Sequence, residues 1–229
     1  GQNNPRDGRP VDRETIMRTI FAKGAVAIAF GVAVAIGGAI DEGSAQTTPA
    51  SLQATPGVTI ERGSARPIPG WVDFCHRYPR ECIVNTSEPE IITLDRDIWR
   101  LINEVNREVN AEIKPMTDQE LYGVADYWTF PYSGYGDCED YQLLKRQRLA
   151  DAGLPRRAMR MTVVIDELSE GHAVLMIRTD RGDFILDNKH DEILSWHETP
   201  YVYVSRESQH ATAWTSLGHA VGPTVTANR

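Results

Sequence analysis

The stretch GYGDCEDYQLLKRQRLADAGLP, residues 134–155, combines a helix with a cysteine at the helix start. We predict a helix from about Asp137 to Ala152, because Gly153 suits the position after a helix end and Pro155 cannot continue the helix. Cys138 then lies in the first turn, where unpaired backbone N–H groups and the helix dipole stabilise a thiolate. The same amides could hold an oxyanion. This position is typical of a nucleophilic cysteine.

Three acidic residues surround that cysteine: Asp137 precedes it, and Glu139 and Asp140 follow it. Negative charge next to a thiol raises the thiol pKa and opposes the helix dipole. A structural role for these acids is to cap the start of the helix, where the helix dipole favours negative charge.

The sequence outside this helix predicts an α+β fold. Apolar residues recur at steps of three and four over residues 94–112, which indicates an earlier helix. After the cysteine helix the period changes to two, and we predict strands over residues 158–167, 171–179, 183–188 and 199–206. Helices followed by a run of antiparallel strands are typical of an α+β domain. The expected core is a nucleophile helix packed on an antiparallel β-sheet.

A histidine and an aspartate lie on two neighbouring predicted strands. His172 begins one strand and Asp187 ends the next. An even-length hairpin loop puts both side chains on the same face of the sheet. A two-residue turn at Asp180–Arg181 puts His172 opposite Lys189, with Asp187 as a diagonal neighbour. A turn at Thr179–Asp180 puts His172 directly opposite Asp187.

Taken together, these residues predict a Cys/His/Asp catalytic triad. Each residue alone has an ordinary structural explanation: a buried cysteine, a strand histidine, an acid in a turn. Their order, with cysteine at a helix start, histidine on a strand and aspartate on the next strand, is far more specific. We predict Cys138 as the nucleophile, His172 as the general base and acid, and Asp187 as the residue that orients the imidazole. The order indicates a papain-like or transglutaminase-like core.

The whole-chain composition excludes some functions. The chain has 229 residues, of which 41% are hydrophobic and 24% charged, and a net charge of -8. The composition is that of a globular protein. An acidic chain without a basic block does not fit a nucleic-acid partner.

The N-terminal region predicts export. Arg18 and Lys23 precede an apolar run rich in Gly and Ala, and small residues follow up to Ala45. We interpret residues 17–45 as a signal peptide cleaved after Ala45, with an uncleaved anchor helix as the alternative. Cleavage would leave no stable membrane insertion, and the mature protein would be periplasmic or secreted.

The rest of the chain divides by composition. Residues 1–16 precede the start Met of this signal, and we expect a vector-derived or over-extended N-terminus. Residues 46–70 are rich in Pro, Ser, Thr and Gly, which predicts a flexible leader. We expect the peptidase domain over residues 71–207 and a loose tail over residues 208–229.

The chain has three cysteines. In an oxidising compartment an odd number indicates one disulfide and one remaining thiol. Cys75 and Cys82 lie close together in FCHRYPREC and form the natural pair, although the sequence alone permits other pairings. Cys138 would then be the free thiol.

The motifs GDCEDY, GHAVL and LDN, with TPYVYVSRES after them, resemble the bacterial transglutaminase-like cysteine proteinases, which include LapG-like periplasmic proteases. The resemblance covers about residues 71–214. It implies that Cys138, His172 and Asp187 carry out catalysis on a protein or peptide substrate, such as a surface adhesin.

The resemblance also implies a cofactor. Acids beside the nucleophile bind calcium in LapG-like members, and the matching residues here are Asp137 and Glu139, with Asp140 as a further candidate. Two other functions stay open. One is acyl transfer or deamidation at glutamine, which uses the same thioester, and the other is a calcium-responsive binding module without catalysis.

Overall fold

In the computed structural model, residues 57–218, 220 and 226 are described. The predicted signal peptide, residues 17–45, and residues 1–16 lie outside this range. The helices are α1 (Pro69–Arg77), α2 (Pro79–Cys82), α3 (Arg96–Glu112), α4 (Asp118–Leu121) and α5 (Cys138–Asp151), with short 3-10 turns η2 (Arg156–Ala158) and η3 (Trp196–Glu198). The strands are β1 (Ser64–Ala65), β2 (Lys114–Pro115), β3 (Tyr135–Gly136), β4 (Met159–Ile165), β5 (Gly171–Thr179), β6 (Gly182–Leu186), β7 (Leu194–Ser195), β8 (Val202–Glu207) and β9 (Trp214–Ser216).

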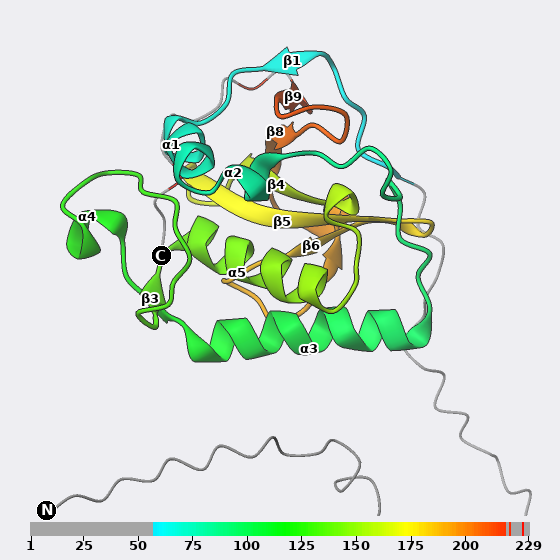
Figure 1. Cartoon of the computed structure of the whole chain (residues 1–229), viewed down its shortest axis with the longest axis horizontal. Coiled ribbons are helices and arrows are strands. Elements are labelled where there is room, and N and C mark those ends of the chain that lie inside the picture. The colour runs from blue at the N-terminus through cyan, green and yellow to red at the C-terminus, as the bar shows by residue number, and fades with distance from the viewer. Residues whose placement is uncertain (1–56, 219, 221–225, 227–229) are drawn as a thin grey trace, which may run out of the picture. The chain divides into compact units, whose positions relative to one another are not determined.

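The main sheet has seven strands in the order β1-β9-β8-β4-β5-β6-β7. All of its neighbouring strands are antiparallel. Helix α5 lies between this sheet and α3, as Figure 1 shows. The predicted α+β fold, with the cysteine helix packed on an antiparallel sheet, is confirmed.

The two predicted long helices, α3 and α5, are both present, and specific residues mark where they begin or end. The carboxylate of Asp95 caps α3 by accepting hydrogen bonds from the backbone N–H groups of Asp97 and Ile98, at 2.9 and 2.8 Å. Gly153 follows α5 with a positive φ of 97°, a conformation that glycine adopts without steric cost. Most of α5 is buried, because it packs against α3 on one side and the sheet on the other.

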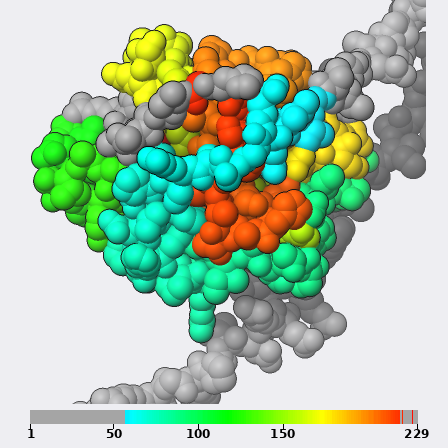
Figure 2. Space-filling view, turned by 90° about the horizontal axis from the view of Figure 1, so that it is seen from above, coloured from blue at the N-terminus to red at the C-terminus, as the bar shows by residue number. Residues whose placement is uncertain are grey.

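The sheet extends beyond the predicted domain at both ends. Strand β1, from the expected leader, pairs with β9, from the expected tail. Figure 2 shows these first described residues, in cyan, against the orange C-terminal strands on one face. Thr59 is buried, and its backbone N–H and hydroxyl donate to Asp183 Oδ2 at 2.9 and 2.7 Å. These contacts join segments far apart in the chain, so their composition alone does not reveal them.

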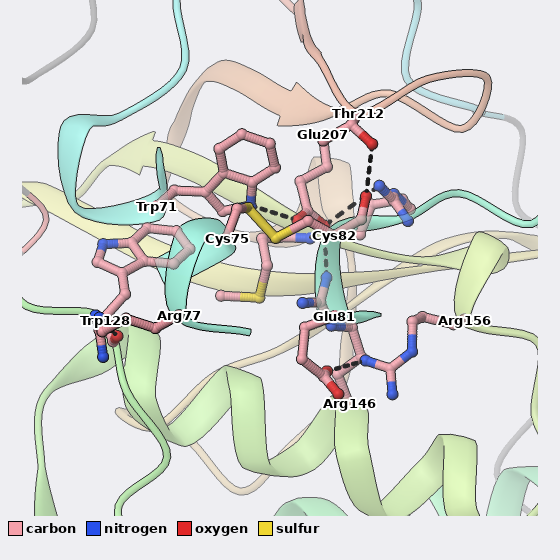
Figure 3. Close-up of a disulfide and its surroundings, with 12 residues drawn as sticks. Trp71, Cys75, Arg77, Glu81, Cys82, Trp128, Arg146, Arg156, Glu207 and Thr212 are labelled. Atoms are coloured by element: carbon pink, nitrogen blue, oxygen red, sulfur yellow. Dashed lines mark hydrogen bonds and ion pairs between the residues drawn. A yellow bond between two sulfur atoms is a disulfide. The ribbon is translucent and has the colours of Figure 1, made fainter. Parts of the chain in front are cut away.

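The predicted disulfide is present between Cys75 and Cys82, and Cys138 is free. The disulfide joins α1 to α2 above the sheet, as Figure 3 shows. Nearby, the buried carboxylate of Glu207 accepts hydrogen bonds from Trp71 Nε1 and Arg146 Nη1, both at 2.6 Å. A buried carboxylate is stable when it is paired in this way. The network ties α1, α5 and β8 together behind the candidate site.

Candidate active site

Cys138 is the first residue of α5 and is fully buried. The backbone N–H of Ala173, on β5, donates to its Sγ at 3.4 Å. Burial raises the pKa of the Cys138 thiol well above its ordinary value, and the charges of Glu139 and Asp137 raise it further, while the Ala173 N–H opposes them. The thiol itself donates to Glu139 Oε2 at 3.1 Å. In this environment the thiol is protonated at neutral pH.

His172 and Asp187 meet on neighbouring strands. The pairing of Thr179 with Gly182 leaves a two-residue loop, Asp180–Arg181, which is the first of the two predicted turns. His172 Nε2 lies 2.9 Å from Asp187 Oδ1. With the aspartate ionised, Nε2 carries the hydrogen, and Nδ1 of a neutral ring is the basic nitrogen.

Asp187 is held as a carboxylate. Burial alone would raise the pKa of Asp187, but hydrogen bonds from His172, the Tyr201 hydroxyl and the Lys189 backbone N–H outweigh that effect. The pKa of Asp187 is therefore lowered. The Tyr201 hydroxyl donates to Oδ2, and the Tyr201 ring lies edge-on to the imidazole with centroids 5.6 Å apart. Tyr201 was absent from the predicted site, because its place beside Asp187 depends on the path of the chain before β8.

The structure brings Cys138 next to β5 but does not pair it with the imidazole. Among the described residues, His172 Nδ1 is buried and has no hydrogen-bond partner. The thiol has two acceptors within reach, the Glu139 carboxylate and the backbone carbonyl of Thr226. Transfer of the thiol proton to His172 therefore requires these contacts to change.

Asp118, Asp137 and Glu139 form a buried acidic cluster beside the nucleophile. One oxygen from each of these three side chains lies within 4.8 Å of the others. Two of the three predicted metal ligands, Asp137 and Glu139, belong to this cluster. The third, Asp140, lies outside this group of three. It is buried, its Oδ1 accepts a hydrogen bond from the backbone N–H of Thr129 at 2.8 Å, and its Oδ2 has no partner among the described residues.

Each carboxylate of the acidic cluster has one oxygen without a partner. Asp118 Oδ1, Asp137 Oδ1 and Glu139 Oε1 are buried and accept no hydrogen bond from the described residues. Burial and the neighbouring charge of Asp118 raise the pKa of Asp137 to about 7. Unpaired carboxylate oxygens at a buried position suit a hard cation such as calcium.

Asp118 lies twenty residues before Cys138 and joins the cluster through a second, small sheet. Strands β2 and β3 run parallel and pair Lys114 with Tyr135. Because of this pairing, the start of α4 lies next to the start of α5. There the Asp118 backbone N–H donates to Asp137 Oδ2 at 3.1 Å. In the sequence, Asp118 has the pattern of an ordinary first-turn acid of a helix, so no local signal marks it as a ligand.

Comparison with known proteins places the chain in a family. The model of the bacterial transglutaminase-like cysteine proteinases, Peptidase_C93, matches residues 60–221. No curated protein matches the chain.

Among solved structures, Legionella pneumophila LapG is 27% identical with a TM-score of 0.42, and covers 48% of this chain and 64% of its own. The calcium-bound form of that protein is 24% identical with a TM-score of 0.46, and covers 55% of this chain and 72% of its own. The chain thus spans less than two thirds of the first of these two structures. The family match covers most of the chain, and we conclude that the chain belongs to the bacterial transglutaminase-like cysteine proteinases.

Proposed function

We propose that the protein is an exported cysteine endopeptidase whose catalytic residues are Cys138, His172 and Asp187. The observation that carries this proposal is the hydrogen-bonded His172–Asp187 pair on the strands next to Cys138, at the start of α5. Family membership supports the reaction class. The disulfide and the predicted signal peptide support export to the periplasm or beyond.

In the proposed mechanism, Nδ1 of His172 takes the thiol proton, and the Cys138 thiolate attacks a peptide carbonyl. Asp187 stabilises the imidazolium and fixes the ring. The imidazolium then protonates the leaving amine, and a thioester remains on Cys138. Water, activated by His172, hydrolyses the thioester and releases the acyl product.

We further propose that the acidic cluster, Asp118, Asp137 and Glu139, binds calcium. The support is its donor set: three buried carboxylates, each with an unpaired oxygen. Calcium takes about six to eight oxygen ligands and tolerates irregular geometry, whereas magnesium retains several waters. A bound cation would supply positive charge beside the thiol. Glu139 engaged in the cluster would no longer hold the thiol hydrogen, and the thiol pKa would fall.

For the substrate, we propose an exported or cell-surface protein, with a surface adhesin as a specific candidate. The support is the family and the predicted export of the chain. The thioester also permits transfer of the acyl group to an amine, so product analysis must separate hydrolysis from transfer.

The proposed activity is tested by comparing cells that produce the wild type with cells that produce Cys138→Ala. New protein N-termini, mapped by mass spectrometry in the exported fraction, should appear with the wild type alone. Hydroxylamine added to the wild type should trap the acyl group as a hydroxamate. If Cys138→Ala yields the same termini while folding normally, the assignment of the nucleophile is wrong.

A further inference from the structure

We propose that Thr226 occupies the active site as a substrate-like ligand, and that Asp126 selects a hydroxyl-bearing residue at the acyl position. The acyl position is that of the residue whose carbonyl carbon the thiolate attacks, and Thr226 fills it here. This inference rests on the proposed endopeptidase function and adds to it a substrate class.

The first observation is the contact between Thr226 and the nucleophile. The Cys138 thiol donates to the backbone carbonyl of Thr226, which is 88 residues away in the chain. Thr226 is fully buried, as are Cys138 and His172. An endopeptidase must expose its nucleophile to a substrate carbonyl, and the carbonyl that contacts this thiol belongs to the chain itself.

The second observation is how Asp126 holds the same residue. The backbone N–H and the hydroxyl of Thr226 donate to Asp126 Oδ1, at 3.3 and 3.2 Å. Asp126 is itself fixed, since the Gly70 backbone N–H donates to its Oδ2 at 3.1 Å and Trp128 Nε1 donates to its Oδ1 at 3.3 Å. Cys138 thus contacts the backbone carbonyl of Thr226, and Asp126 contacts its backbone N–H and its hydroxyl.

The position of Asp126 is built into the fold. A Cβ on Gly70 would lie 2.2 Å from Asp126 Oδ2, so only glycine permits the approach. Gly70 is the second residue of α1, and Trp128 is fully buried in the core. A carboxylate held in this way accepts a hydrogen bond from the hydroxyl of Thr or Ser, whereas the side chains of Val and Ala have no donor to offer it.

The chemistry at this carbonyl balances as an ordinary hydrolysis. Attack by the Cys138 thiolate on the Thr226 carbonyl carbon forms the C–S bond and breaks the C–N bond to Ala227. The amine of Ala227 takes its proton from His172, and water then splits the thioester. The segment that follows Thr226 would leave with Ala227 as its new N-terminus, and Thr226 would carry the new C-terminal carboxylate.

Occupancy is tested first, with a measurement that needs no protease activity. The rate of alkylation of Cys138 by iodoacetamide is measured on the unreduced full chain, on a chain ending at Gly218 and on Thr226→Val, all in chelator. The chain ending at Gly218 retains β9, and its melting temperature confirms folding. We expect at least a tenfold faster reaction after truncation and an intermediate rate for Thr226→Val. Equal rates in all three folded proteins would overturn the proposal.

Selection is tested next, with the synthetic peptide AVGPTVTANR, which matches residues 220–229, and with its Val and Ser versions at position 226. The Thr and Ser peptides should slow alkylation of the truncated chain at concentrations about tenfold lower than the Val peptide, because a hydrogen bond to a carboxylate is lost in the latter. Asp126→Asn should reduce this preference. If the Thr and Val peptides protect equally, Asp126 does not select the hydroxyl.

The same peptides separate this proposal from the proposed activity. Protection of Cys138 without cleavage of any peptide or protein would refute the endopeptidase and leave the binding site standing. Cleavage of exported proteins with no effect of the C-terminal segment on alkylation would refute the present inference alone. Loss of the segment that follows Thr226 from the wild type, but not from Cys138→Ala, would support both.

Discussion

His172 Nε2 and Asp187 Oδ1 lie 2.9 Å apart, and this contact leaves Nδ1 of His172 as the nitrogen without a partner among the described residues. The pair thus selects one tautomer of the neutral imidazole. Tyr201 and the Lys189 backbone N–H hold the carboxylate from other directions. The role of His172 as a base depends on this arrangement.

Asp187→Asn should lower kcat by about 1,000-fold or more, because an amide can stabilise the wrong tautomer and cannot stabilise the imidazolium as a carboxylate does. Tyr201→Phe removes one hydrogen bond to Asp187 and keeps the carboxylate, so a loss of about tenfold or less is expected. Kinetics of both variants, with ¹⁵N chemical shifts of His172 to report the tautomer, make the comparison. Equal losses in the two variants would contradict the orienting role of Asp187.

Calcium should stabilise the protein and activate the thiol. At a concentration one hundred times its dissociation constant, a ligand adds about 2.7 kcal/mol to the free energy of unfolding. The melting temperature should rise with calcium relative to chelator, and alkylation of Cys138 should accelerate. Asp137→Asn should remove both responses, whereas Glu108→Gln, an exposed acid on α3, should retain them. A wild type indifferent to calcium in both measurements would remove the metal proposal.

The Cys75–Cys82 disulfide should stabilise the folded state. It closes a short loop with a sequence separation of 7, for which the chain-entropy model predicts about 2 to 3 kcal/mol. Denaturant unfolding of Cys75→Ser/Cys82→Ser against the wild type measures the difference. Alkylation of the unfolded, unreduced wild type should modify Cys138 alone, and three modified thiols would disprove the pairing.

Lys145 on α5 should make stability depend on pH. Burial lowers its pKa from 10.5 to about 7, although the charges of Asp187 and Asp191 oppose the shift. Between these two values the unfolded chain holds the proton and the folded chain does not, so the free energy of unfolding increases with pH. Below about pH 7 the buried charge carries its full cost.

Lys145→Met should therefore raise the free energy of unfolding at pH 6 by about 3 kcal/mol. This value is smaller than the full free-energy equivalent of the pKa shift of Lys145. The advantage should shrink as the pH approaches 10. Lys114→Met, at an exposed position on β2, is the control and should show no such trend. Parallel stability curves for the wild type and Lys145→Met over this range would show that Lys145 does not titrate as described.

The sequence reveals the parts of the site that depend on local patterns. The helix at Cys138 has marked ends, and the alternation over β5 and β6 fixes which face His172 and Asp187 share. Asp118, Asp126 and Thr226 are different, because each reaches the site through pairing or packing with distant residues. The sequence around Asp118 has no periodic pattern from which the pairing of β2 with β3 could be predicted. Likewise, strand β1 has two residues, and its partner β9 lies about 150 positions later.

The pairing of β1 with β9 also limits where the chain can be truncated for recombinant expression. β9 stands between β1 and β8 in the sheet. A recombinant fragment that starts at residue 71 would lack β1 and expose the backbone groups of β9 along an open edge. Open edges recruit strands from other molecules, so such a fragment would be prone to self-association. Expression boundaries should therefore begin before Thr59, whose buried hydrogen bonds to Asp183 hold the first described segment to β6.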